Sequence, residues 1–340
     1  MKTRAPAATW ARLDDAALLR LRFRDLGLKI RQSDVHADTV KVGDELERRG
    51  IRFRPHFWFS TDWFSPDGVP GIAVPFFLAH PRLLRLEHRM TGEAEGGNRR
   101  WRLRLLRHEL GHAVDTAFAL RRRRDWQRVF GRPGVPYSRN YTARPRSRNH
   151  VLHLEHWYAQ SHPTEDFAET FAVWLQPRAR WRTEYAGWPA LAKLEFVDAL
   201  MADIAGRAPN RRDRSVVSPV AGNSRTLGEH YRRRAGLTAG SDPRYDRWLL
   251  GVFTPRASRR AVAAERWLRE IQPRLMQTLL RRTGVHPYVA HQVLRALRQR
   301  ARALDLTLRG TKRGTETAVM KLHQRAIAEL LRRNEEIFRL

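Results

Sequence analysis

The sequence has no cysteine, no long apolar run and few lysines, and each shortage excludes a class of protein. Without cysteine among its 340 residues the chain cannot form disulfides, iron–sulfur clusters, zinc ribbons or a thiol nucleophile. Any metal ion must therefore be bound by histidine, aspartate or glutamate. No run approaches the ~18 consecutive apolar residues of a membrane span, and residues 1–15 lack the apolar segment of a secretory signal. We expect a cytoplasmic protein with no membrane span.

Acidic residues are scarce relative to basic ones. The 65 lysine and arginine residues outnumber 35 aspartate and glutamate residues, the formal net charge is +30, and only six of the basic residues are lysines. Residues 251–340 carry 20 basic and 7 acidic residues, a higher density of positive charge than residues 1–250. One interpretation is an anionic partner such as nucleic acid. We favour the other, a solvated arginine-rich surface, because arginine is spread along the whole chain.

The order of hydrophobic patterns predicts an α+β fold with a small mixed sheet. Apolar residues make up 42% of the chain and include 11 Trp, 14 Phe and 7 Tyr, which is enough for a folded core. Alternating patterns predict strands, and a 3–4-residue periodicity predicts helices. The predicted strands are 51–60 and 72–78, and the predicted helices are 101–120, 163–175, 189–204, 259–282, 287–304 and 316–338.

A polar, arginine-rich stretch at residues 207–225 divides the chain, because it lacks the periodicity of its flanks. We predict a catalytic domain over residues 1–206 and a basic loop or linker over residues 207–240. A basic, mainly helical C-terminal region then covers residues 241–340.

Two histidines on the predicted helix 101–120 indicate a metal site. Residues 108–112 read His-Glu-Leu-Gly-His, so His108 and His112 are four residues apart and lie on one helix face. This is the HExxH arrangement, in which two neutral imidazoles bind zinc and the intervening glutamate, Glu109, acts as a general base beside the metal. The alternative is a core helix that carries two surface histidines and an exposed glutamate.

A third metal ligand should come from a separate element, so that the donors converge from different directions. The predicted helix 163–175 offers Glu165, Asp166 and Glu169, and the two glutamates share a helix face. One of them can bind the metal while the other accepts a hydrogen bond from a ligand histidine. Asp115 is a rival ligand, but it lies on the same helix as both histidines, so we expect it to have a structural role.

Other polar side chains near these motifs leave alternatives open. Tyr158 lies seven residues before Glu165 and can donate a hydrogen bond to a developing oxyanion, or it can simply pack. His150, His153 and His156 are spaced three residues apart, which permits a second metal site, although a surface role is favoured. His162 is expected to order the loop before the helix 163–175.

Two segments carry a resemblance to a known family. They are His108-Glu-Leu-Gly-His112 and Tyr158-Ala-Gln-Ser-His-Pro-Thr-Glu-Asp-Phe-Ala-Glu-Thr-Phe-Ala, and segments 63–83, 181–201 and 226–231 add to the likeness. The chain resembles bacterial zinc-binding metallopeptidases of the gluzincin type and, more distantly, the catalytic domain of anthrax lethal factor. Some similar peptidases carry an N-terminal zinc ribbon built from cysteine pairs, which this chain lacks.

The resemblance implies a zincin-like catalytic core and a role for each motif residue. Implied are zinc ligands at His108, His112 and Glu165, a general base at Glu109, an oxyanion donor at Tyr158, and support of a ligand histidine by Glu169. It also implies an edge strand that pairs with an extended substrate, for which residues 71–78 are the candidate. We predict a zinc-dependent hydrolase, most simply a peptidase, acting on a peptide or amide. The alternative is a nucleic-acid-associated basic protein with an accessory or inactive site.

Overall fold

The computed structural model describes residues 9–91, 94–137, 144, 147–236, 243–256, 258, 261–283 and 287–333. Over these residues the chain is α+β, mostly helical with little sheet. They fall into two compact units that divide between residues 228 and 229. The boundaries predicted at 206/207 and 240/241 remain predictions. No helix among the described residues is long and apolar enough to cross a bilayer, and a cytoplasmic location also remains a prediction.

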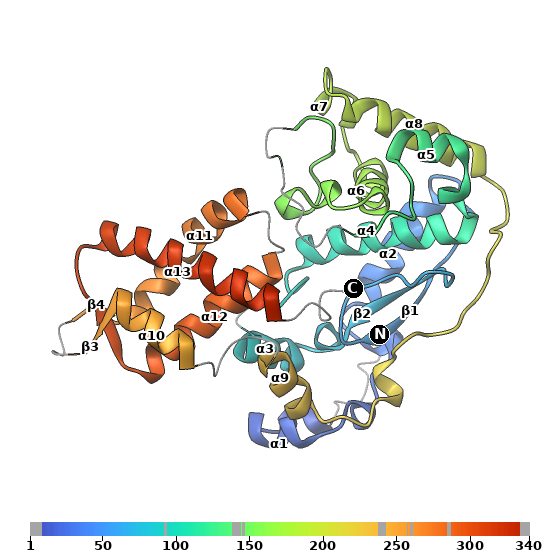
Figure 1. Cartoon of the computed structure of the whole chain (residues 1–340). Coiled ribbons are helices and arrows are strands. Elements are labelled where there is room, and N and C mark those ends of the chain that lie inside the picture. The colour runs from blue at the N-terminus through green and yellow to red at the C-terminus, as the bar shows by residue number, and fades with distance from the viewer. Residues whose placement is uncertain are drawn as a thin grey trace. The chain divides into compact units, whose positions relative to one another are not determined.

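The first unit is built from α-helices joined by short 3₁₀ turns and one pair of strands (Figure 1). Its α-helices are α1 (Asp15–Arg20), α2 (His36–Glu47), α3 (Pro81–Thr91), α4 (Arg99–Phe118), α5 (Arg124–Phe130), α6 (Pro163–Leu175), α7 (Trp181–Glu184) and α8 (Ala190–Ile204), and α9 (Leu227–Gly236) begins at the division. The 3₁₀ turns are Thr9–Arg12, Phe23–Leu26, Ile30–Gln32, Phe76–Ala79, Leu120–Arg122, Glu155–Gln160 and Val220–Gly222.

The sheet of the first unit is a parallel pair, β1 (His56–Ser60) and β2 (Gly71–Pro75). A turn-rich connection joins the strands, and within it Phe64 forms an antiparallel bridge to Ala73. The antiparallel part of the predicted mixed sheet is limited to this bridge.

The outer edge of β2 has no free backbone donor. Residues alternate between the two edges of a strand, and Ala73 N faces outward because it donates to Phe64 O at 2.8 Å. Gly71 shares that edge, and its N–H donates to Val69 O at 2.8 Å. Pro75, also on that edge, has no N–H to donate. The outer edge of β2 therefore offers no backbone donor to an extended substrate, which argues against the predicted pairing at residues 71–78.

Helices α4 and α6 match the predicted segments 101–120 and 163–175. The Asn98 side chain accepts from Trp101 N at 2.8 Å at the start of α4, and α4 ends at Ala119 in the left-handed conformation. The His162 side chain caps α6 as expected of a loop-ordering residue, and Pro163 occupies its first turn. α4 contacts β2 on one side and α6 on the other (Figure 1).

Gly111 allows α4 and α6 to approach closely. A Cβ at this position would lie 2.9 Å from Ala168 Cα and 3.2 Å from Ala168 O, closer than packed atoms tolerate. The short distance between α4 and α6 at this crossing therefore requires a residue without a side chain at position 111. Since His108 and His112 flank Gly111, and Glu165 lies one turn before Ala168, this contact also sets how far apart the two motifs lie.

Replacing Gly111 with alanine should destabilise the protein by about 1–2 kcal/mol, because overpacking costs ~1–3 kcal/mol and the helix-propensity gain returns at most ~1 kcal/mol. The free energy of unfolding from urea titration measures this change. Gly43→Ala in α2 is the matched control, since the nearest atom to its added Cβ is 3.6 Å away. The control should be neutral or slightly stabilising. Equal stability of the two variants would contradict the packing argument.

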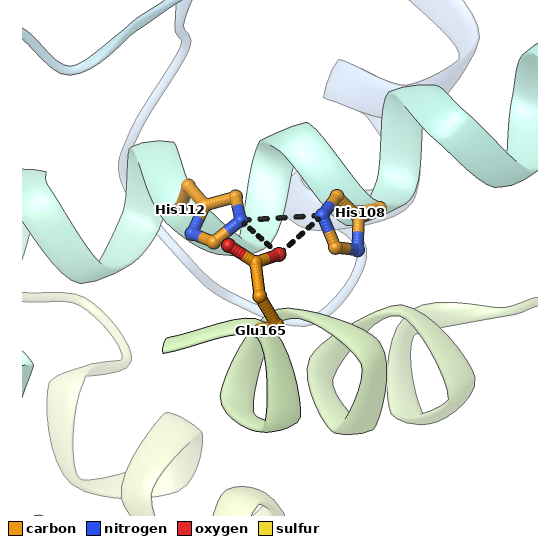
Figure 2. A group of neighbouring side chains, drawn as sticks. All are labelled: His108, His112 and Glu165. Atoms are coloured by element: carbon orange, nitrogen blue, oxygen red, sulfur yellow. Dashed lines mark hydrogen bonds and ion pairs between the residues drawn. The ribbon is translucent and has the colours of Figure 1, made fainter. Parts of the chain in front are cut away.

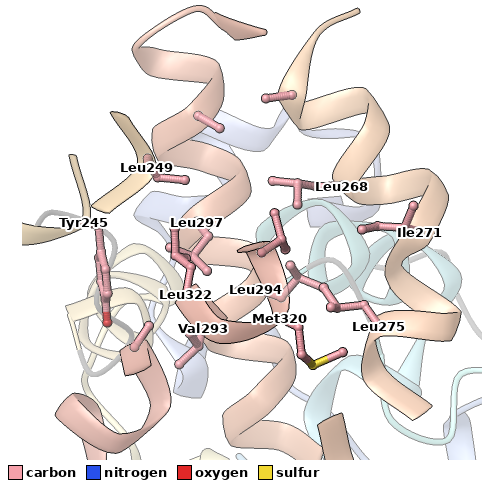
Figure 3. Packing of buried hydrophobic residues seen from close by; sticks show 14 of the residues in the cluster. Tyr245, Leu249, Leu268, Ile271, Leu275, Val293, Leu294, Leu297, Met320 and Leu322 are labelled. Carbon is pink, nitrogen blue, oxygen red and sulfur yellow. The ribbon is translucent and has the colours of Figure 1, made fainter. Parts of the chain in front are cut away.

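The second unit is mainly helical and has its own hydrophobic core. Its elements are α9 from Glu229 onward, α10 (Pro243–Val252), β3 (Phe253–Pro255), α11 (Ala264–Thr283), α12 (Pro287–Ala303), β4 (Leu306–Leu308) and α13 (Lys312–Arg333), with β3 and β4 antiparallel. Figure 3 shows buried aliphatic side chains meeting between these helices.

Part of the positive charge of this unit is neutralised by ion pairs within the unit. Described pairs join Arg300 to Asp246 and Arg298 to Glu265. Both arginines keep about a quarter or less of their side chains exposed, so they are held against the fold rather than extended into solvent. The choice between a solvated arginine-rich surface and an anionic partner stays a prediction.

Candidate metal centre

Three side chains from α4 and α6 converge on one place. His108 and His112 come from successive turns of α4, and Glu165 comes from the first turn of α6; Figure 2 shows the three pointing toward one another. His108 Nε2 lies 3.1 Å from Glu165 Oε2, His112 Nε2 lies 3.2 Å from the same oxygen, and the two Nε2 atoms are 3.2 Å apart. Within the described residues, this is the group of histidine and acidic side chains arranged to hold a metal ion.

The spacing of these donors fits a tetrahedral zinc ion. Ligands about 2.0–2.1 Å from a tetrahedral zinc lie about 3.3 Å from one another, close to the separations of the three donors. The chemistry also fits, because two imidazoles and one carboxylate are typical ligands of catalytic zinc. His108 and Glu165 are buried, while His112 keeps 13% of its side chain exposed, so solvent reaches the group from the His112 side.

Glu169 fixes the orientation of His108. Its Oε1 lies 2.8 Å from His108 Nδ1, and its Oε2 accepts a hydrogen bond from Leu154 N at 2.7 Å. When neutral His108 donates its Nδ1 hydrogen to this carboxylate, its Nε2 lone pair faces His112 and Glu165, and this is the form that can bind a metal. Of the two glutamates that share a face of α6, Glu165 is the one at the donor group and Glu169 the one behind the histidine.

The charges of the group are coupled. Burial lowers the pKa of His108, but hydrogen bonds to Glu165 and Glu169 outweigh it and raise this pKa well above the ordinary value. Burial raises the pKa of Glu165, but His112 and His108 outweigh it and hold the pKa well below the ordinary range. The position of Glu165 in the first turn of α6 favours its negative charge as well. A cation that binds here must therefore compete with a proton on His108.

The charges of all three donors affect the pKa of Glu109, but Glu109 is not one of the donors. It is buried, and burial is the main cause that raises its pKa, with a further contribution from Glu165 and opposing ones from His108 and His112. Among the described residues its carboxylate makes no hydrogen bond. A carboxylate with a raised pKa and no competing partner is suited to accept a proton.

Tyr158 lies beside the group in the 3₁₀ turn before α6. Its ring centroid is 5.6 Å from that of His108. Burial and then the nearby Glu165 raise the pKa of Tyr158 well above the ordinary value, so its phenol stays protonated and able to donate. The preceding residue, Trp157, has a φ of 57°, a conformation that bulky side chains rarely adopt.

The other candidates lie apart from the donor group. Asp115 is fully buried and pairs with the backbone N–H and side chain of Arg121, which is the structural role that we expected. Burial lowers the pKa of His153 to about 4, and its Nε2 lies 3.0 Å from Arg104 O. His150 Nε2 lies 3.7 Å from Asp166 Oδ2. The side chain of His156 lies outside the described residues, and the described ones form no second metal-ligand group.

Sequence reasoning missed a second tyrosine at this site. The Tyr137 hydroxyl donates to Glu165 Oε1 at 2.6 Å. No spacing rule links it to the motifs, because it lies 28 residues before Glu165 in a loop. The same reasoning missed Lys193, whose ammonium pairs with Asp166 one residue after Glu165. Burial still raises the pKa of Asp166 to about 6.

Comparisons with known proteins agree with this centre at a coarse level. No curated protein and no solved structure matches the chain. Residues 94–200, which contain all of α4 and α6 and the turn that carries Tyr158, match the model of a family described as "Putative zinc-binding metallo-peptidase". This segment, which is less than a third of the chain, is therefore similar to a family described as zinc-binding.

Proposed function

We propose that the protein is a zinc-dependent hydrolase that cleaves peptide or related amide bonds, with zinc held by His108, His112 and Glu165. The observation that carries this proposal is the meeting of these three donors at separations of 3.1–3.2 Å, which a tetrahedral ion requires. The family match over residues 94–200 supports the class of reaction.

The chemistry is divided between the ion and the side chains around it. A zinc ion bound there would supply Lewis-acid chemistry, lowering the pKa of water and polarising a carbonyl. Glu109 accepts the proton of the attacking water and passes it to the leaving amine. Tyr158 donates a hydrogen bond to the oxygen on which negative charge develops. Glu169 keeps His108 in the tautomer and orientation that binding requires.

Removing the metal tests this function directly. Purified protein should contain about one zinc per chain, hydrolyse members of a diverse peptide library, lose that activity with a chelator and regain it when zinc is returned. The circular dichroism of the chelated protein controls for unfolding. Hydrolysis that persists after complete removal of the metal would exclude the proposal, and the pattern of cleaved peptides would give the side-chain preference.

A further inference from the structure

Tyr137 contacts the candidate zinc ligand Glu165 on the oxygen that faces away from the histidines. Its hydroxyl lies 2.6 Å from Glu165 Oε1, whereas Oε2 is the oxygen within 3.2 Å of His108 and His112. In this contact the Tyr137 hydroxyl donates and Glu165 Oε1 accepts. The single hydrogen of the Tyr137 hydroxyl is therefore committed to Oε1.

The Tyr137 ring packs against His162, the residue that caps α6. The ring of His162 stacks on it at a centroid distance of 3.9 Å and an interplanar angle of 10°. His162 Nε2 lies 2.8 Å from Val135 O in the same loop, and its Nδ1 accepts from Thr164 N at 3.2 Å. One imidazole thus joins the loop 131–137 to the first turn of α6.

Thr164 completes this arrangement. Its hydroxyl lies 2.9 Å from the Tyr137 oxygen and 2.7 Å from His162 Nδ1. The Thr164 hydroxyl has a single hydrogen, so it can donate to only one of these two atoms at a time. The phenol oxygen is therefore fixed by two polar neighbours and its ring by a stacked imidazole, although the residue as a whole is 46% exposed.

We propose that Tyr137 is a positioning residue that restricts Glu165 to binding zinc through a single oxygen, Oε2. This inference rests on the proposed function. The hydrogen bond to Oε1 opposes the rotation that would bring both oxygens toward one ion, which would keep the coordination number low and a place open for substrate. Without the hydroxyl, Glu165 is free to rotate and to bind through both oxygens.

Deleting the hydroxyl tests the inference without relying on activity. Tyr137→Phe should weaken zinc about 10- to 100-fold, the usual effect of losing a hydrogen-bond partner of a ligand, measured by competition with a chromophoric chelator. In protein loaded with Co²⁺, the visible absorption of this variant should weaken and shift as the coordination number rises. Tyr185→Phe is the matched control, because its hydroxyl accepts from Leu152 N and contacts none of the three donors. The control should keep both the affinity and the spectrum of the wild type.

A second variant covers the case in which Tyr137→Phe does not fold. His162→Asn keeps a side chain that can cap α6 but removes the stacked ring, and it should weaken zinc in the same direction. Unchanged affinity and an unchanged cobalt spectrum in a folded Tyr137→Phe, or in His162→Asn if the first variant is unfolded, would overturn the positioning role and leave the proposed function standing. A wild-type protein that binds no zinc would overturn both.

Discussion

Replacing Glu109 with glutamine should lower kcat by about 100- to 10,000-fold, the range for removing a general acid–base group, while zinc stays bound. Glutamine has the shape of glutamate but cannot accept a proton from water. The metal content should not change, because Glu109 is not one of the three donors. Stability should stay the same or rise, since burial already penalises the charged form of this carboxylate. Steady-state hydrolysis, zinc analysis and thermal unfolding of the same preparation measure the three quantities.

Glu195→Gln is the control for this variant, because it makes the same change at an exposed position of α8. It should match the wild type in all three measurements. Retention of more than about a tenth of the activity by Glu109→Gln would place the general base elsewhere. Loss of zinc from that variant would make Glu109 a ligand rather than a base.

Replacing His112 with alanine should weaken zinc by roughly 100- to 1,000-fold and remove hydrolysis at ordinary metal concentrations. Structural four-ligand sites bind zinc with ~10–16 kcal/mol, or about 2.5–4 kcal/mol for each ligand. His112 is a better target than His108, because removing His108 would also take away the imidazole that contacts Oε1 of the buried Glu169, leaving only the hydrogen bond from Leu154 N. Equilibrium competition with a chelator of known affinity measures the change.

An exposed histidine provides the comparison for His112→Ala. His88 in α3 is exposed and belongs to no donor group among the described residues, so His88→Ala should bind zinc as the wild type does. Excess zinc should partly restore activity to His112→Ala if the lost imidazole acts only through metal affinity. Wild-type affinity in His112→Ala would remove this residue from the site and with it the basis of the proposed function.

The sequence predicted the parts of the site that local rules determine. The spacing of His108 and His112 on a periodic helix placed their imidazoles on one face, and the structure has them on successive turns of α4. Pro163 and the apolar pattern after it predicted the bounds of α6, which match the structure. From the residues we predicted that one of the two glutamates would bind the metal and the other would accept a hydrogen bond from a ligand histidine. Only the resemblance implied which glutamate has which role.

The features that the sequence did not predict depend on contacts between distant segments. Pro75 indicated an edge strand correctly, but the return of the chain through Phe64, which closes that edge at Ala73, has no local pattern. Tyr137 was missed for the same reason, because a tyrosine in a Gly- and Pro-containing loop becomes informative only when its partner in space is known. The role of Gly111 was missed for the same reason, because nothing in the local sequence shows that Ala168 packs against it.

The blocked edge of β2 bears on the substrates that we expect under the proposed function. Proteases that bind a peptide as an added strand at a sheet edge need several consecutive peptide bonds in the substrate, whatever its side chains. Here Phe64, Val69 and Pro75 remove that template. Under the proposed function, we therefore expect selectivity to depend on the chemical groups that flank the cleaved bond, and we expect short or non-ribosomal amides to be cleaved as well as polypeptides. Screens should include small acyl-amine compounds from the outset.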